Sequence, residues 1–310
     1  MNAHEDRPAL SEAMAIDHIR QIVLDRGFSA AFDDDCAQGI PQTDLISTDT
    51  IVEHRHFERR WDSHYEIGRQ AAVANLSDIA ASGGRPAWTT RALTLPPTMT
   101  LSELDALARG YMTVCADFCV PLIGGNLTCS DGPMVVTVTV GGQTVGSTPI
   151  ARSGARMGDN IYVSGNLGDA ALGVKHPTTE TRANRHRWRP HVAEAAYLVQ
   201  TGAVTSMMDV SDGLLLDLDR LTASSKVQAR IRSAAIPSSA LYRRYFGDDP
   251  RVALCGGEDY VLLFTAGPEF QPPTWATLIG DCRHGAGIFV DDERTEAQGF
   301  DHFQTEIVRD

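Results

Sequence analysis

The sequence predicts an α/β or α+β chain of two domains. Short β-branched segments alternate with helix-like segments along 310 residues, which is long enough for two ordinary domains. Some of the strand-like segments follow one another directly, so the alternation is not strict. A stretch rich in small and polar residues, "GSTPIARSGARMGD" (146–159), separates two such units. We therefore predict an N-terminal domain over 1–148 and a C-terminal domain over 149–310.

The first unit reads as a helix followed by an alternation of strands and helices. Residues 11–26 have apolar positions at helical spacing, and "HYEIGRQAAVANLSDIAASGG" (64–84) is an Ala-rich helix that stops at a glycine pair. Thr100 followed by Glu103 has capping-box spacing at the start of another amphipathic helix. Three short apolar or β-branched segments predict strands: "LISTDTIVE" (45–53), "PLIGGN" (121–126) and "MVVTVTVGG" (134–142).

The second unit continues the alternation. "NIYVSG" (160–165) is strand-like, and "GDAALGV" (168–174) starts a helix. "SMMDVSDGLLLDLDRL" (206–221) passes from a buried segment through an acidic turn into a helix. "VALCGGEDYVLLFT" (252–265) holds two apolar runs around a Gly-Gly-Glu-Asp turn, and "HPTTETRANRH" (176–186) predicts a loop.

Composition excludes some classes of partner. The chain is 43% hydrophobic and 22% charged, as expected of a soluble globular protein. Its formal net charge is -13, which argues against nucleic acid or an anionic membrane as a partner, because both are bound by basic surfaces. A small anionic ligand remains compatible if metal ions first neutralise local carboxylates.

The cysteines and the N-terminus predict a cytoplasmic location. The six cysteines contain no C-x-x-C pair and lie mostly among apolar residues, which suits reduced thiols rather than disulfides or a zinc site. The opening "MNAHEDRPAL" lacks the basic-then-apolar order of a signal peptide. No apolar run approaches the roughly 18 residues of a membrane span.

Acidic residues form four clusters at positions that we expect to be turns or strand ends. They are Asp33-Asp34-Asp35, Asp49 in "STDT", Asp78 in "NLSD", and Asp209 with Asp212 in "DVSDG". Magnesium takes oxygen ligands and keeps waters or substrate phosphates in its shell, so single aspartates beside Ser or Thr suit a metal–nucleotide complex. Successive side chains of an extended segment point to opposite faces, so only one or two residues of the triplet can serve one ion.

Each cluster also has a purely structural explanation. An acidic triplet in a loop is commonly solvated, and "SDG" before an apolar run is foremost a helix N-cap signal. Spacing alone therefore leaves metal binding open. The only lysines are Lys175 and Lys226, and neither belongs to a P-loop; G-x-G-x-x-G is absent as well. If the chain binds a nucleotide, metals and arginines must carry the phosphates.

An ordered set of motifs resembles one family. The motifs are "DDDCA", "STDTIVEHRHF", "NLSDIAASGGRPAW", "LIGGN", "ARSGARMGD", "YVSGNLGDAALG", "MDVSDGLLLDL", "GGEDYVLLFT" and "GFDHF", which run from about residue 30 to 303. In this order they are similar to the thiamine-monophosphate kinase family, within the superfamily of aminoimidazole ribonucleotide synthetase. The resemblance implies a two-domain synthetase-like fold, in which the N-terminal domain pairs through its sheet in a homodimer and the C-terminal domain closes over nucleotide and acceptor.

The resemblance also implies the reaction. ATP and thiamine monophosphate would give ADP and thiamine diphosphate by direct in-line transfer, assisted by several Mg²⁺ ions and without a covalent enzyme intermediate. No nucleic acid or membrane takes part in such a reaction.

Site residues follow from the resemblance, position by position. The implied catalytic aspartates are Asp35, Asp49, Asp78 and Asp212. The implied metal ligands are Asp34, Asp35, Ser47, Thr48, Asp49, Asp78, Asp209 and Asp212. ATP would contact Gly125, Asn126, Arg152 and Ser211, and the acceptor would contact His56, Glu258 and Phe300. His56 also fits a packed histidine, Phe300 ordinary core and Arg152 a surface arginine at a domain junction.

Several positions depart from the family's pattern. Asp33 and His54 stand where the family keeps glycine, Gln70 replaces a lysine, and Trp188 replaces a leucine. Asn126 stands where many members have aspartate. These changes touch the acceptor side more than the ATP–metal side. Two alternatives therefore stay open: a related ATP-dependent kinase with another small acceptor, and a non-catalytic nucleotide-binding homologue.

Overall fold

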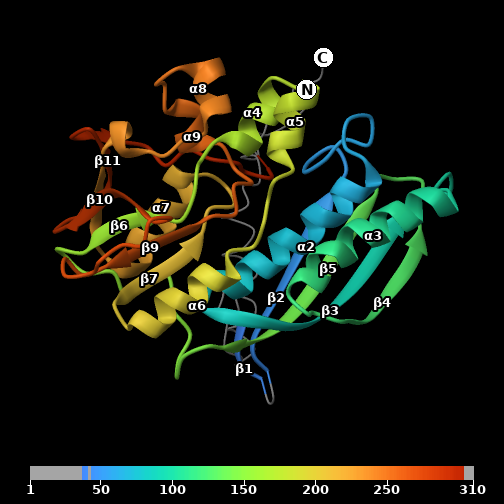
Figure 1. Ribbon diagram of the computed structural model, residues 1–310, viewed down its shortest axis with the longest axis horizontal. Coiled ribbons are helices and arrows are strands. Elements are labelled where there is room, and N and C mark those ends of the chain that lie inside the picture. Colours follow the sequence, from blue (N-terminus) through green and yellow to red (C-terminus); the bar gives the residue numbers. More distant parts are fainter. Residues whose placement is uncertain (1–36, 41–42, 304–310) are drawn as a thin grey trace, which may run out of the picture.

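Figure 1 shows the computed structural model, which describes residues 37–40 and 43–303. Two mixed sheets, each covered by helices, lie side by side with helix α2 (His64–Ala81) in contact with elements of both. The predicted helix over 11–26 and the triplet Asp33-Asp34-Asp35 lie outside the described residues. The two-unit α/β architecture that the sequence predicts is confirmed.

The first sheet has five strands in the order β1-β2-β5-β3-β4. Their bounds are β1 Ala37–Ile40, β2 Thr43–Val52, β3 Gly84–Leu95, β4 Leu122–Cys129 and β5 Val135–Thr144. All neighbours are antiparallel except β3 and β4, which run parallel. The predicted strands at 45–53, 121–126 and 134–142 correspond to β2, β4 and β5. β3 was not anticipated, because its polar residues obscure the alternation.

Helices α2 and α3 (Leu101–Asp117) pack together over this sheet (Figure 1). Both start at the capping boxes that their sequences allow: Ser63 with Glu66, and the predicted Thr100 with Glu103. α2 is buried around most of its circumference, because the first sheet, α3 and the second unit cover different sides of it. The predicted glycine end is confirmed, since Gly83 just beyond α2 adopts φ 72°.

The second sheet has seven strands in the order β12-β11-β8-β10-β6-β9-β7. Their bounds are β6 Asn160–Val163, β7 Val204–Asp209, β8 Gln228–Ile231, β9 Leu262–Ala266, β10 Thr277–Arg283, β11 Gly287–Val290 and β12 Glu293–Thr295. β8 and β11 are parallel, and the other neighbours are antiparallel. The last described strand of the first unit ends at Thr144 and β6 begins at Asn160, so the predicted boundary at 148/149 falls in the connecting segment and stays a prediction.

Helices cover both faces of this second sheet. α4 (Asp169–Lys175), α7 (Leu214–Ser225), α8 (Ala240–Phe246) and α9 (Arg251–Cys255) share one core with alternate strand residues such as Ile161 and Val163. α6 (Val192–Thr201) packs on the intervening residues, among them Tyr162, and also contacts α2. A short 3₁₀ turn, η1 (Ser233–Ala235), follows β8. None of the described helices is both long and apolar enough to cross a membrane.

The loop predicted over 176–186 is wrong. The structure forms a two-turn helix there, α5 (Thr179–Arg185), which begins at a capping box made by Thr178 and Thr181. Past its end the chain carries Trp188 into the core of the first unit, where the indole is 5% exposed. α5 belongs to the second unit in sequence, so the segment from α5 to Trp188 holds the two units together through packing.

Candidate active site

Helix α2 links aspartates from both sheets. Ser47 of β2 donates its hydroxyl to the carboxylate of Asp78. The preceding residue, Ser77, donates to Oδ2 of Asp209, the last residue of β7, over 2.5 Å. The short sequence "NLSD" therefore contacts the first sheet through Asp78 and the second sheet through Ser77.

Asp49 joins this group through the same helix. Its backbone N–H donates to Oδ1 of Asn75 over 3.1 Å. Ser47 and Asp49 are two residues apart on β2, so their side chains leave the same face of the sheet. Thr48 lies between them, and its hydroxyl contacts Thr139 of β5 at 2.8 Å, on the opposite face.

The expected local settings of two of these residues are wrong. Asp78 lies in the last turn of α2 rather than in a turn between elements, and Asp49 lies within β2 rather than at its end. The prediction failed because "STD" and "NLSD" resemble caps and turns when each is taken alone. The helical period of α2 instead places polar residues 75, 77 and 78 beside the two strands that carry acids.

Two loops of the second unit interlock around Ser211. The N–H of Glu258 donates to the Ser211 carbonyl over 2.7 Å, and the N–H of Tyr260 donates to the Val210 carbonyl over 2.8 Å. A Cβ on Gly257 would stand 2.6 Å from the Ser211 carbonyl oxygen, so only glycine fits at this close approach. Glu258 has φ 67°, in the left-handed region, and its side chain leaves the loop in a fixed direction.

Asp217 supports the loop that carries Ser211 and Asp212. Its Oδ2 accepts the backbone N–H groups of Ser211, Asp212 and Gly213 at 3.0, 3.0 and 3.1 Å. Burial raises the pKa of Asp217 to about 7; the negative charge of Asp212 adds to the effect, whereas Arg220 opposes it. The sequence analysis missed Asp217 as a functional residue, although an aspartate four residues after "DG" at a helix start is a visible signal.

Arg220 completes this corner. Its guanidinium donates to Oδ2 of Asp212 over 2.5 Å and to Oδ1 of Asp217 over 2.8 Å. Burial raises the pKa of Asp217, and the carboxylates of Asp212 and Asp217 raise that of Arg220 against burial. The charge of Arg152 weakly opposes both rises, so this predicted phosphate ligand lies near them. Two arginines and two aspartates therefore gather beside Ser211.

The three residues predicted to contact the acceptor come together. The rings of His56 and Phe300 have centroids 6.0 Å apart, and the N–H of Phe300 donates to the Asp212 carbonyl over 2.8 Å. Gln70 bridges His56 and Glu258, since its amide donates to Oε1 of Glu258 over 2.6 Å and to the His56 carbonyl over 3.2 Å. His302, 5.0 Å from the His56 ring, also lies here and was not predicted.

His56 is held as a neutral donor. Its Nδ1 accepts the Val52 N–H at 3.0 Å, so the proton of the neutral ring is assigned to Nε2. Burial lowers the pKa of His56, although the charge of Glu258 opposes the effect. Two residues earlier, His54 adopts φ 68°, a conformation that glycine takes more easily, which explains why a glycine would suit this position.

Two predicted ATP ligands lie apart from the acidic group. Gly125 and Asn126 are on β4, an edge strand, with both β3 and β5 between it and β2. At about 4.8 Å per strand, β4 runs about 14 Å from β2. The predicted ligands Asp34 and Asp35 lie outside the described residues.

The donor set suits magnesium rather than zinc. Asp49, Asp78 and Asp209 offer only oxygen atoms, which magnesium prefers, and it commonly takes one or two carboxylates together with substrate phosphates. Within residues 37–40 and 43–303, no three His, Cys, Asp or Glu side chains are close enough together to hold a metal ion by themselves. A metal bound here would therefore share its shell with substrate phosphates.

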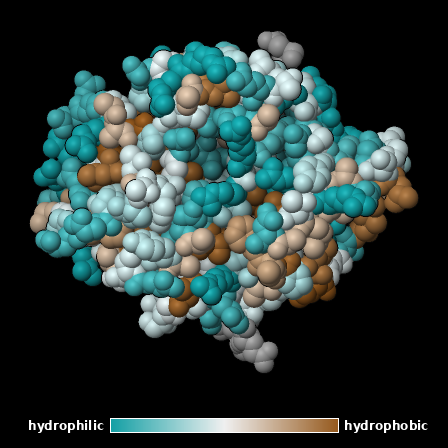
Figure 2. Space-filling view, viewed as in Figure 1, coloured by the Kyte–Doolittle hydropathy of each residue, from teal (hydrophilic) through white to brown (hydrophobic). Residues whose placement is uncertain are grey.

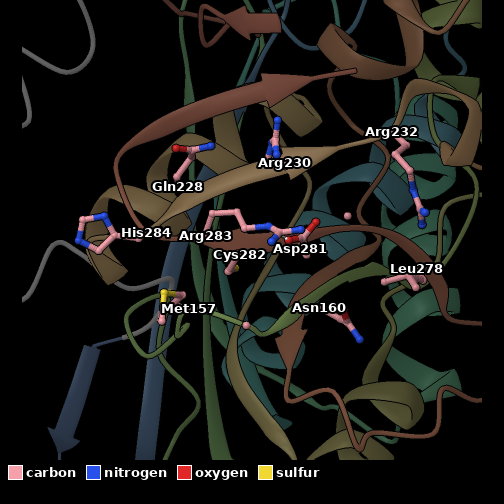
Figure 3. Close-up of a pocket in the computed structure, with 12 residues that line it drawn as sticks. Met157, Asn160, Gln228, Arg230, Arg232, Leu278, Asp281, Cys282, Arg283 and His284 are labelled. Carbon is pink, nitrogen blue, oxygen red and sulfur yellow. Dashed lines mark ion pairs between the residues drawn. The ribbon is translucent and has the colours of Figure 1, made fainter. Parts of the chain in front are cut away.

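A cavity of about 850 Å³ lies elsewhere, on the second sheet (Figure 3). Residues of β6, β8 and β10 line it, among them Asn160, Arg230 and Leu278. Arg230 pairs with Asp292 over 2.5 Å, and Arg283 pairs with Asp281. None of the predicted site residues lines this cavity, and two of its three lining arginines are paired with carboxylates.

Comparisons with known proteins identify relatives over most of the chain. The family AIR synthase related protein, N-terminal domain, matches residues 33–144. The chain is 34% identical to the thiamine-monophosphate kinase of Aquifex aeolicus over 275 residues, which are 84% of this chain and 88% of that protein. It is 35% identical to the thiamine-monophosphate kinase of Escherichia coli K12 over 282 residues, which are 86% and 85% of the two chains.

Solved structures match this chain over nearly its whole length. AaThiL complexed with AMPPCP and TMP superposes with a TM-score of 0.86 at 30% identity, covering 95% of this chain and 97% of that one. The hydrogenase maturation protein HypE in complex with ATP has a TM-score of 0.67 at 16% identity and so shares the fold alone. The fold, the placement of the acidic residues and the similarity over most of its length lead to one conclusion: the chain belongs to the thiamine-monophosphate kinase family.

Proposed function

We propose that the protein transfers the γ-phosphoryl group of ATP to thiamine monophosphate, with ADP and thiamine diphosphate as products. The observation that carries the proposal is the joint position of two groups on α2. Asp78 contacts Ser47 of β2, and Gln70 contacts the predicted acceptor residues His56 and Glu258. These two positions are eight residues apart, or about 12 Å along the helix axis, so one rigid element sets the spacing between phosphate and acceptor ends.

The reaction needs position and charge neutralisation. A phosphate oxygen of thiamine monophosphate attacks the γ-phosphorus, the bond to the β-phosphate oxygen breaks, and ADP leaves with that electron pair. Both reactants are anions, and Mg²⁺ ions held at this site would supply the positive charge that their approach requires. Asp49, Asp78, Asp209 and Asp212, together with Asp34, Asp35, an oxygen atom of Ser47 and the backbone carbonyl of Thr48, are the proposed residues that would hold such ions.

The remaining proposed contacts divide between the two substrates. Arg152 and Ser211 would meet the ATP phosphates, since both lie beside the Asp212 loop. At the acceptor end, the Nε2–H of neutral His56 is available as a donor. The Glu258 carboxylate and the Phe300 ring suit a cationic thiazolium, which is attracted to a negative charge and an aromatic face.

A homodimer that pairs through the first sheet is part of the proposal. β4 is exposed along most of its length, with Ile123 60% and Leu127 61% exposed, and an apolar edge strand favours pairing with another chain. Apolar residues gather over this end of the molecule in Figure 2. A second copy bound there would cover Gly125 and Asn126, the proposed ATP contacts that lie apart from the acidic group. We place the enzyme in the cytoplasm and propose no nucleic-acid or membrane partner.

Acceptor dependence tests the proposal. ADP formation with Mg·ATP is measured with thiamine monophosphate and, as the matched control, with thiamine, which lacks only the attacking phosphate. We expect ADP to form in step with thiamine monophosphate consumed and no ADP above background with thiamine. Equal rates with both compounds, or none with either, would contradict the proposed reaction. Turnover only with a different small phosphate would favour the related kinase instead.

A further inference from the structure

Arg185 is a buried cation at the acceptor end of the site. It is the last residue of α5 and is 7% exposed. One terminal nitrogen donates to Oε2 of Glu258 and to the His56 carbonyl, both at 2.9 Å, and the other lies 3.3 Å from Oδ1 of Asp62. A single guanidinium from the second unit thus contacts the predicted acceptor residues and a carboxylate of the first unit.

Gln70 holds the same two groups from the opposite side. Its amide nitrogen is 2.6 Å from Oε1 of Glu258 and 3.2 Å from the His56 carbonyl, and the residue is 1% exposed. Each oxygen of the Glu258 carboxylate therefore has its own donor, and the His56 carbonyl accepts from both donors. Glu258 is still 21% exposed, so it remains accessible to a ligand.

The segment that carries Arg185 is itself fixed. Arg69 of α2 donates to the carbonyls of His186 and Trp188 over 2.6 and 3.2 Å. Trp188 is buried in the first core, edge-on to Tyr260 at 6.2 Å between centroids. The guanidinium is consequently placed by packing on both sides, as a group that sets the geometry of a site must be.

Two carboxylates and one guanidinium meet at this corner, and the residue at position 70 is neutral. Arg185 lies between the carboxylates of Glu258 and Asp62, and Asp62 also contacts His186 at 3.2 Å. Burial would raise the pKa of Asp62, but the close contact with His186 and the charge of Arg185 outweigh it and lower that pKa. A second cation at position 70 would face Arg185 across one carboxylate in a buried setting, where like charges repel strongly.

We propose that Gln70 and Arg185 are a matched pair of positioning residues that fix Glu258 and the His56 loop for acceptor binding. The inference rests on the proposed function only in that His56, Glu258 and Phe300 bind the acceptor. The pair consists of one amide and one cation, and the proposal requires both to be present.

A charge-swap cycle tests the pairing. Gln70→Lys and Arg185→Gln are made singly and together, and KM is measured for thiamine monophosphate and for ATP. Each single change is expected to raise the acceptor KM about 10-fold or more while the ATP KM stays within about 2-fold. The double variant again presents one cation and one amide, so its acceptor KM should return to within about 3-fold of the wild type.

Controls separate positioning from stability. Arg182→Gln, on the same helix, removes a 3.0 Å bond to the Trp61 carbonyl without touching Glu258, and should leave the acceptor KM unchanged. Gln70→Leu, which adds no charge, replaces Gln70→Lys if that variant does not fold. An acceptor KM within 2-fold of wild type in both single variants, a double variant no better than the worse single one, or an equal rise in ATP KM would overturn the proposal.

Unfolding measurements keep the two proposals distinguishable. The free energies of unfolding of the same four proteins form a second cycle that needs no turnover. A wild type that folds but gives no thiamine diphosphate would overturn the proposed function alone. Additive unfolding effects of the two substitutions would overturn the pairing alone, because a matched pair must show recovery in the double variant.

Discussion

Asp78 is the proposed metal ligand that joins helix α2 to the first sheet. It projects from the last turn of α2, accepts the Ser47 hydroxyl and is only partly buried, so its carboxylate can take a further ligand. We predict that Asp78→Asn lowers kcat about 10²-fold or more, because it removes a preorganised charge. Steady-state kinetics check this, with Asp105→Asn on exposed α3 as a control that should change nothing. An unchanged rate would remove Asp78 from the metal site.

His191 gives a pH-dependent prediction of stability. It is 7% exposed and contacts Ser164 at 2.9 Å; burial lowers its pKa from 6.5 to about 4, with Arg189 adding to the effect and Glu194 opposing it. Below pH 6.5 the unfolded chain binds a proton that the folded chain refuses, so stability falls as the pH drops from 6.5 towards 4. The loss is on the order of 3 kcal/mol.

Urea denaturation at several pH values checks the His191 prediction. The difference in unfolding free energy between wild type and His191→Gln should favour the wild type less at pH 4.5 than at pH 7. Other acids titrate in both proteins and cancel in the difference. A difference independent of pH would show that His191 is not held neutral.

The motifs predict a set of site residues but not the contacts that hold them. His56, Glu258 and Phe300 were predicted from short motifs, and the structure brings them together. Arg185 could not be found in this way, because its partner Glu258 is 73 residues away and only the fold brings the two into contact. An ordinary arginine carries no local signal for such a role.

At the scale of elements, the interlocked loops at 210–213 and 256–260 are the least tolerant part of the site. Gly257→Ala would place a methyl group 2.6 Å from the Ser211 carbonyl oxygen, which is backbone and cannot turn aside. We predict a loss of about 2–4 kcal/mol in unfolding free energy, within the usual range for overpacking and displaced backbone, together with loss of activity.

Thermal and urea unfolding test this with a matched control. Gly267→Ala lies at the turn after β9, where a Cβ would meet nothing within 4 Å, and should be nearly neutral. If Gly257→Ala were as stable and active as Gly267→Ala, the loops would not be coupled as described.

Elements with strong local signals were predicted well, and short polar ones were not. The sequences of α2 and α3 contain capping boxes and long apolar patterns, which indicate helices. α5 has seven residues and few apolar ones, so its capping threonines at 178 and 181 were the only sign of a helix. Its stability comes from tertiary contacts of Arg182, Arg185 and the following Trp188 with the first unit.

At the scale of the whole molecule, the exposed edge strand β4 predicts a homodimer. Its exposed Ile123 and Leu127 lie on an edge strand, and we expect the wild type to be a dimer. Replacing both with lysine should give a monomer by light scattering, because charged residues on an edge block strand pairing. Val174→Lys, at an equally exposed apolar residue of α4, should leave the dimer intact. A monomeric wild type would contradict this assembly.

The division into two units could be predicted from composition shifts, but the contacts between the two units could not. α2 contacts α6 and β7 of the second unit, and Trp188 enters the first core. Such contacts depend on which faces meet after folding, and one sequence without relatives does not reveal them. The acidic triplet that opens the motif set lies outside the described residues, so Asp34 and Asp35 remain predicted ligands.

The most direct test follows the transferred phosphorus itself. The protein is incubated with Mg²⁺, thiamine monophosphate and ATP labelled in the γ-phosphate, and the products are separated by chromatography. We predict that the label enters the terminal phosphate of thiamine diphosphate in equal amount to the ADP formed, with none retained on the protein. Label found only in inorganic phosphate, label bound covalently to the protein, or no transfer at all would contradict direct transfer between the two substrates.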